Sequence, residues 1–154
     1  MTELQIGDQT IRYDREATAA AYEVVQKGDT EICACLFCKN FLIQRNVAYP
    51  ASFKAMLQQL GIDLNKEGEV FECGPDAEGY HLYGGWFYLI GELVTPGENS
   101  CSGPAPLEFA SFFANSGPKP FYFKGEPLLL LEFSARIQWV LPDDPNSGRR
   151  FAAE

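Results

Sequence analysis

Residues 51–61 read ASFKAMLQQLG, and they decide the fold class because the hydrophobic period of the chain changes after them. Four apolar side chains follow the i, i+3, i+4, i+7 spacing of one helix face: Phe53, Met56, Leu57 and Leu60. Gly61 then supplies the residue type that most often ends a helix, since glycine adopts a left-handed backbone without strain. We therefore predict an amphipathic helix that stops at Gly61.

A second helix is expected just before this one. Phe37 and Phe41 sit at helical spacing in a segment, residues 36–45, that lacks glycine and proline. The chain therefore places a pair of helices at about residues 36–61.

After Gly61 the sequence is typical of successive antiparallel strands. Segments rich in aromatic and β-branched or other apolar residues alternate with Gly, Pro and Asn clusters: residues 69–72, 80–83, 86–94, 109–113, 121–124 and 128–140. Gly84 and Gly85 are expected to form a turn or bulge between two of them. The predicted fold class is α+β, an antiparallel β-rich sheet or sandwich with the helix pair packed on it.

The N-terminal segment favours hairpins. Residues 3–6 and 9–13 read as two short strands joined at Gly7 and Asp8. Residues 17–26 contain alanines that favour helix, but the run Tyr22 to Val25 before a Gly-Asp pair is typical of a strand entering a turn. We favour a second hairpin, with residues 30–34 returning.

Length and composition indicate one globular domain over residues 1–154. The 154 residues are 46% hydrophobic and include 12 Phe, 7 Tyr and 2 Trp, which is enough for a substantial core. Residues 96–106 form the longest predicted loop, and residues 142–154 form a polar C-terminal tail.

The charge of the chain argues against two classes of partner. Twelve basic and 21 acidic residues give a net charge of -9, which repels nucleic acid and anionic membrane surfaces alike. The longest uncharged apolar runs are too short to span a bilayer, and five cysteines is an odd number. We expect a soluble cytoplasmic protein with reduced thiols, whose partner is an unidentified protein or small molecule.

Three of the five cysteines fall within six residues, at Cys33, Cys35 and Cys38. If they meet at a strand-to-helix turn, all three sulfurs can bind one zinc ion, for which thiolate is a preferred ligand. Cys73 or the single histidine, His81, can supply the fourth ligand, and Cys101 is a further candidate. We expect no cofactor, with a structural zinc ion as the alternative.

Three alternatives to a zinc site remain open for the cysteine cluster. Cys35-Leu36-Phe37-Cys38 is a C-x-x-C pair at the start of a predicted helix, a placement that resembles thioredoxin-like proteins, although their βαβ pattern is missing. Free cysteines are also among the residue types most often buried, and a packing role is the interpretation that we favour. A thiol enzyme that uses His81 has no supporting sequence motif.

An aromatic segment provides a second candidate site. Its members, proposed as a ligand-binding platform with one polar group, are Tyr83, Trp86, Tyr88 and His81. The alternative is that these rings pack a two-layer core.

Residues 63–68 match the first half of a calcium-binding EF-hand loop. Position 12 of that loop is Gly74 in place of the bidentate glutamate, and a strand pattern follows where a second helix is needed. We therefore predict a helix C-cap at Gly61 followed by a solvated polar turn.

Several segments resemble a group of small uncharacterised bacterial proteins with a C-x-C-x-x-C-x-N-F segment, a helical stretch and an aromatic sheet. The segments that carry this resemblance are residues 33–41, 49–50, 60–63, 66–69 and 83–87. The group offers no function to transfer, and the resemblance implies only a bacterial cytoplasmic setting. Our first functional hypothesis is a non-enzymatic binding or interaction domain. The alternatives are a zinc-stabilised domain and a thiol redox protein.

Overall fold

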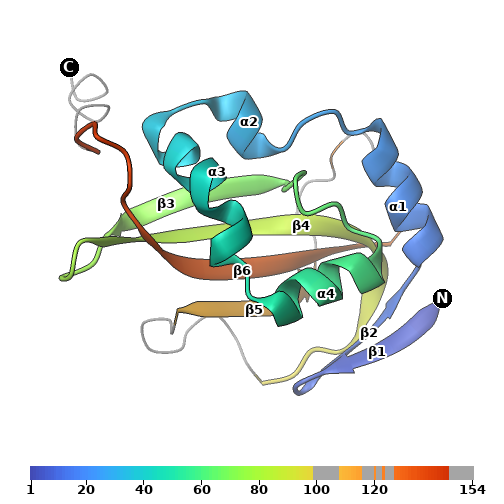
Figure 1. The fold of residues 1–154 in the computed structure, drawn as a ribbon. Coiled ribbons are helices and arrows are strands. Elements are labelled where there is room, and N and C mark those ends of the chain that lie inside the picture. The colour runs from blue at the N-terminus through green and yellow to red at the C-terminus, as the bar shows by residue number, and fades with distance from the viewer. Residues whose placement is uncertain (99–107, 116–119, 121–122, 124–126, 146–154) are drawn as a thin grey trace.

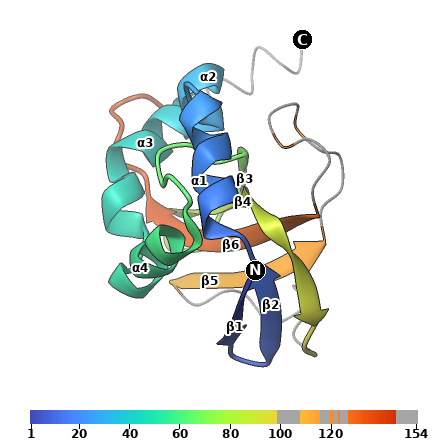
Figure 2. The ribbon, with the colours of Figure 1, turned by 90° about the vertical axis from the view of Figure 1, so that its right-hand side faces the viewer.

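The computed structural model describes residues 1–98, 108–115, 120, 123 and 127–145. In chain order its elements are β1 (Thr2–Ile6), β2 (Gln9–Tyr13), α1 (Arg15–Val24), α2 (Asp29–Cys33), α3 (Leu36–Ala48), α4 (Ala51–Leu60), β3 (Glu69–Pro75), β4 (Tyr80–Thr95), β5 (Phe109–Asn115) and β6 (Leu128–Gln138). The strands form an antiparallel sheet with the helices on one face (Figures 1 and 2), which confirms the predicted α+β fold and its helix pair. Parts of three predicted segments lie outside the described residues: loop residues 99–106, tail residues 146–154, and the strand 121–124 except Phe123, which lies in a bend.

The long strand β4 is the centre of the sheet, whose strand order is β1-β2-β4-β6-β5. On one side β4 pairs with β6 without interruption, from Tyr80 opposite Gln138 to Ile90 opposite Leu128. On its other side the first half of β4 pairs with β3 and the second half with β2. Side chains along this part of β4 therefore alternate between the two faces of the sheet.

The predicted turn or bulge at Gly84 and Gly85 is wrong, because both residues lie inside β4. A Cβ at Gly84 would lie 2.6 Å from the ring of Phe71, and a Cβ at Gly85 would lie 2.5 Å from the carbonyl oxygen of Glu69. The two glycines therefore leave room for close packing against β3, and they do not break the strand.

The predicted second hairpin is also wrong, because residues 15–24 form α1 and residues 29–33 form α2. Asp14 caps α1, since its Oδ1 accepts a hydrogen bond from the backbone N–H of Ala17 at 2.9 Å. Gly28, which was expected in a turn, is the N-cap of α2. The alanines indicated the local structure correctly, and the apolar run that suggested a strand is the last turn of a helix.

The first hairpin is confirmed, with Ile6 paired to Gln9 across Gly7 and Asp8. Gly7 has φ +59°, the left-handed conformation that favours glycine at this turn. The side chain of Gln9 is buried and reaches the far edge of the sheet, where it exchanges two hydrogen bonds of 2.8 Å with the backbone of Phe113 in β5.

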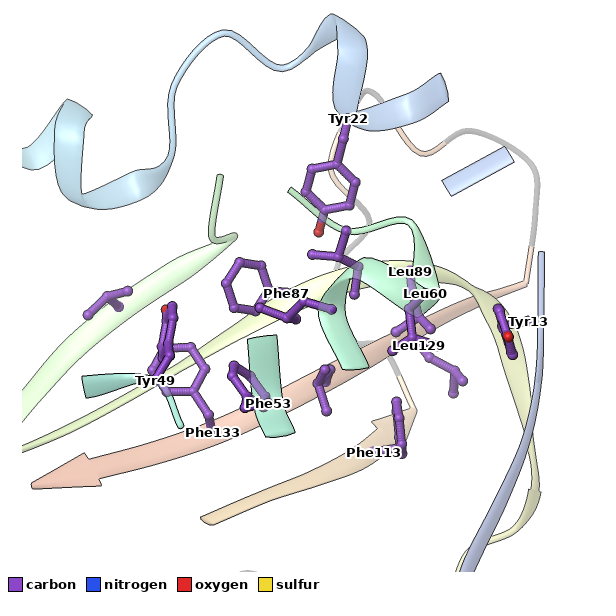
Figure 3. Packing of buried hydrophobic residues seen from close by; sticks show 14 of the residues in the cluster. Tyr13, Tyr22, Tyr49, Phe53, Leu60, Phe87, Leu89, Phe113, Leu129 and Phe133 are labelled. Carbon is purple, nitrogen blue, oxygen red and sulfur yellow. The ribbon is translucent and has the colours of Figure 1, made fainter. Parts of the chain in front are cut away.

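The core lies between the helices and the sheet face that they cover (Figure 3). Tyr49 and Phe53 bring their rings against those of Phe87 and Phe133, with centroids 5.3 Å apart for Tyr49 and Phe133. Burial of each such side chain contributes about 1.5–3 kcal/mol. Among the described residues, no helix is both long and apolar enough to cross a membrane.

Candidate metal centre

The cysteine cluster lies where α2 ends and α3 begins. Ala34 separates the two helices and adopts a left-handed conformation, φ 55°, which is uncommon for a residue with a side chain. Cys35 is extended, φ -75° and ψ 169°, and is the N-cap of α3, where its Sγ accepts a hydrogen bond from the backbone N–H of Cys38 at 3.4 Å. The reversal at Ala34 thus turns the last residue of α2, Cys33, back towards the first turn of α3.

The sulfur atoms of Cys33, Cys35 and Cys38 all lie within 4.8 Å of one another. Cys33 and Cys35 are exposed, whereas Cys38 is buried. Tetrahedral zinc with Zn–S bonds of about 2.3 Å places its thiolates about 3.8 Å apart, so these sulfurs need to approach one another by no more than about 1 Å. The sulfurs therefore lie together, as the zinc hypothesis requires, but at a junction of two helices and not at the strand-to-helix turn that the sequence suggested.

The surroundings shift the pKa values of Cys35 and Cys38 in opposite directions. Burial alone would raise the pKa of Cys35, but the N–H of Cys38 and the neighbouring thiols outweigh it, and the pKa is lowered. For Cys38, burial and then the two neighbouring thiols raise the pKa. Cys35 is therefore the first of the pair to ionise, and a metal ion must displace the proton of Cys38 against its raised pKa.

The other predicted ligands lie outside this group. Cys73 is exposed on β3, and its thiol pKa is raised by burial and then by Glu72. His81 is buried on β4, with Nδ1 3.1 Å from Oε1 of Glu72 and its ring 5.0 Å from that of Trp139. Cys101 lies outside the described residues. Among the described residues, the group that could hold a metal ion therefore consists of the three sulfurs of Cys33, Cys35 and Cys38.

The predicted aromatic platform is divided between the two faces of the sheet. Tyr83 and His81 lie on the helix-covered face, because they share the parity of Phe87 in β4, and both are buried. Trp86 and Tyr88 have the opposite parity and are half-buried. The Nε1 of Trp86 is buried without a hydrogen-bond partner among the described residues.

Tyr83 links the platform residues to the cysteine cluster. Its hydroxyl donates to the backbone carbonyl of Phe37 at 2.8 Å, inside the C-x-x-C segment. Asn40, two residues after Cys38, is fully buried; its side chain donates to the carbonyl of Gln138 at 3.1 Å and accepts from the N–H of Val140 at 2.9 Å. These contacts fix the first turns of α3 to β4 and to the end of β6.

Glu67 is the residue near this site that sequence reasoning missed. The predicted C-cap at Gly61 is confirmed by its φ of 81°, but the turn that follows is not solvated at Glu67, which is buried. Glu67 accepts hydrogen bonds from the backbone and hydroxyl of Thr30, at the start of α2, and pairs with Arg45 of α3. Its partners lie 22 and 37 residues away, so no local pattern marks it.

Comparison with known proteins gives this site no relatives, since no family model, curated protein or solved structure matches the chain. The structure confirms the cysteine cluster of the C-x-C-x-x-C segment. Membership of the bacterial group that the segment resembles stays a prediction.

Proposed function

We propose that this protein binds one zinc ion through Cys33, Cys35 and Cys38. The convergence of the three sulfur atoms within 4.8 Å carries the proposal, because it brings soft ligands from two helices to one point. Thiolates favour zinc and other soft ions over calcium and magnesium, which prefer oxygen ligands.

Both helices that carry the cysteines are anchored to the rest of the fold by hydrogen bonds, which favours a preformed binding site. The N-terminus of α2 is held by Glu67 through Thr30, with 3.0 Å between Oε1 and the backbone nitrogen. The first turn of α3 is held by Tyr83 through Phe37. Ligands that are positioned before the metal arrives lose less conformational entropy when they bind it.

Three protein ligands leave one tetrahedral position of the ion open. Because Cys33 and Cys35 are exposed, that position faces solvent and accepts water or a ligand from a partner. Such a three-ligand site also exchanges its metal more readily than a closed four-ligand site. The predicted role in binding a protein or small molecule stays a prediction.

The test is a metal titration of the reduced full-length chain after chelator treatment. Cobalt substitution reports thiolate ligation by sulfur-to-metal charge-transfer absorption, and zinc displaces the cobalt. We expect one equivalent per chain, with the affinity lowered at least tenfold in Cys33→Ser, Cys35→Ser and Cys38→Ser. Cys73→Ser is the matched control and retains the affinity. Less than about 0.2 equivalents of zinc in the reduced wild type would refute the proposal.

A further inference from the structure

Two of the three ligands share one helical turn, whereas the third belongs to another helix. Cys35 is the N-cap of α3 and Cys38 is its third residue, and the N–H of Cys38 points at Sγ of Cys35. Cys33 ends α2, on the far side of the left-handed Ala34. Cys35 and Cys38 are therefore better placed to form a disulfide with each other than either is with Cys33.

We propose that Cys35 and Cys38 form a reversible disulfide under attack by hydroperoxides, and that this oxidation releases the zinc ion. The inference rests on the proposed zinc site and adds a mode of regulation to it. A disulfide removes two of the three described ligands, and the single remaining thiolate of Cys33 cannot retain the ion.

The exposure of the two sulfurs assigns their order of reaction. Cys35 is exposed and meets the peroxide first, whereas Cys38 is buried behind it and completes the bond. The Cys35 thiolate attacks one peroxide oxygen, the O–O bond breaks, and the leaving oxygen takes a proton from solvent, which gives a sulfenic acid and an alcohol or water. Cys38 sulfur then attacks Cys35 sulfur, the S–O bond breaks, and the hydroxide leaves as water after taking a second proton.

The electron balance needs no further reactant. Two thiolates lose two electrons to the O–O bond, and Cys33 takes up a third proton from solvent as the zinc ion departs. A thiol reductant such as glutathione reverses the step by thiol–disulfide exchange, in which two of its own thiols are oxidised.

The backbone accommodates the Cys35–Cys38 bond better than its alternatives. Both residues lie in the first turn of α3, whose position is set by Tyr83 and Asn40 and need not change. A bond from Cys33 must instead cross the strained reversal at Ala34 within two or five residues. The outcome of oxidation is therefore one defined disulfide.

The experiment uses the zinc-loaded full-length chain, prepared without oxygen and treated with hydrogen peroxide. A chromogenic chelator follows zinc release, and peptide mass spectrometry maps the disulfide. We expect one zinc released per chain together with a Cys35–Cys38 bond, and recovery of zinc binding after reduction. Metal-free Cys33→Ser should form the same bond, whereas Cys35→Ser and Cys38→Ser should not, and Cys73→Ser should behave as the wild type.

The possible failures are distinguishable. Zinc that binds at one equivalent and stays bound after peroxide treatment overturns the inference and leaves the zinc site standing. Release accompanied by a different disulfide, or by sulfinic acid on Cys35, also overturns it. A reduced chain that binds no zinc refutes the proposed function itself, and the regulation falls with it.

Discussion

Glu67 and Arg45 form an ion pair in the interior, with 2.9 Å between Oε2 and Nη1 and no accessible surface on the glutamate side chain. The other carboxylate oxygen accepts from Thr30, and Arg45 also lies 3.6 Å from Glu31 of α2. One carboxylate from the loop after α4 therefore holds both helices that carry the cysteines. The position of the cysteine cluster thus depends on a charge pair that lies outside it.

Glu67→Gln should destabilise the protein by about 3 kcal/mol, because it removes the closer and fully buried counter-charge of the Arg45 guanidinium and leaves only the exposed Glu31 at 3.6 Å. Urea unfolding measures the loss, and zinc affinity should fall with it as α2 loses its anchor. The exposed Glu69→Gln is the matched control, with an expected change within about 0.5 kcal/mol. Equal stability of the two variants would show that the buried pair contributes nothing.

Gly85→Ala should cost about 1–3 kcal/mol, because the new methyl group meets the Glu69 carbonyl at 2.5 Å and the buried ring of Phe133 at 2.7 Å. Gly84→Ala meets only the ring of Phe71, which is 45% exposed and can rotate away, so its cost should be much smaller. Thermal unfolding of the two variants gives the comparison. The reverse order would mean that the β3–β4 contact is looser at Gly85 than these distances indicate.

Gln9→Ala should destabilise the protein by about 1–3 kcal/mol, since the backbone N–H and carbonyl of Phe113 lose their partners. Gln5→Ala, on the exposed face of the neighbouring strand, should be nearly neutral. Chemical denaturation provides the measurement, and hydrogen exchange at the Phe113 amide should accelerate in the Gln9 variant alone. An unchanged exchange rate at that amide would contradict the contact.

Glu132 provides a pH-dependent test, since burial raises its carboxyl pKa above the ordinary 4.5. The folded state then binds the proton more tightly than the unfolded state, so this group's contribution to stability falls as pH rises from about 4.5 through the folded pKa. Glu132→Gln resembles the protonated acid. It should match the wild type at acidic pH and exceed its stability at neutral pH, as followed by denaturation at several pH values.

Asp76 should give the opposite dependence in the same experiment. A hydrogen bond from Arg136 lowers its pKa from the ordinary 3.8, so its stabilising contribution is complete above that value and is lost as pH falls through the folded pKa. Asp76→Asn should therefore be less stable than the wild type at neutral pH, and the difference should vanish in acid. If the stability of Glu132→Gln and of Asp76→Asn, each relative to the wild type, changed with pH in the same way, the pair of pKa assignments would be refuted.

The sequence by itself determined the features that local chemistry controls. Strand β4 was predicted as two strands, and most of the predicted strand 121–124 lies outside the described residues. The helix ending at Gly61, the hairpin at Gly7 and Asp8, and strands at the positions of β3, β5 and β6 were predicted correctly. Each depends on hydrophobic period or on backbone freedom within a few residues. The crowding of three cysteines into six residues is likewise a property of the sequence alone.

Only the tertiary structure decided where the cysteine sulfurs lie and which partner the buried acid Glu67 has. Helix α1 replaced the predicted strand because its face packs on the sheet through Tyr22, a contact that periodicity in a short segment cannot report. The burial of Glu67 depends on Arg45, which is distant in the chain. The three sulfurs meet because Ala34 adopts a left-handed backbone, and long-range anchoring of the helices on either side holds that reversal in place.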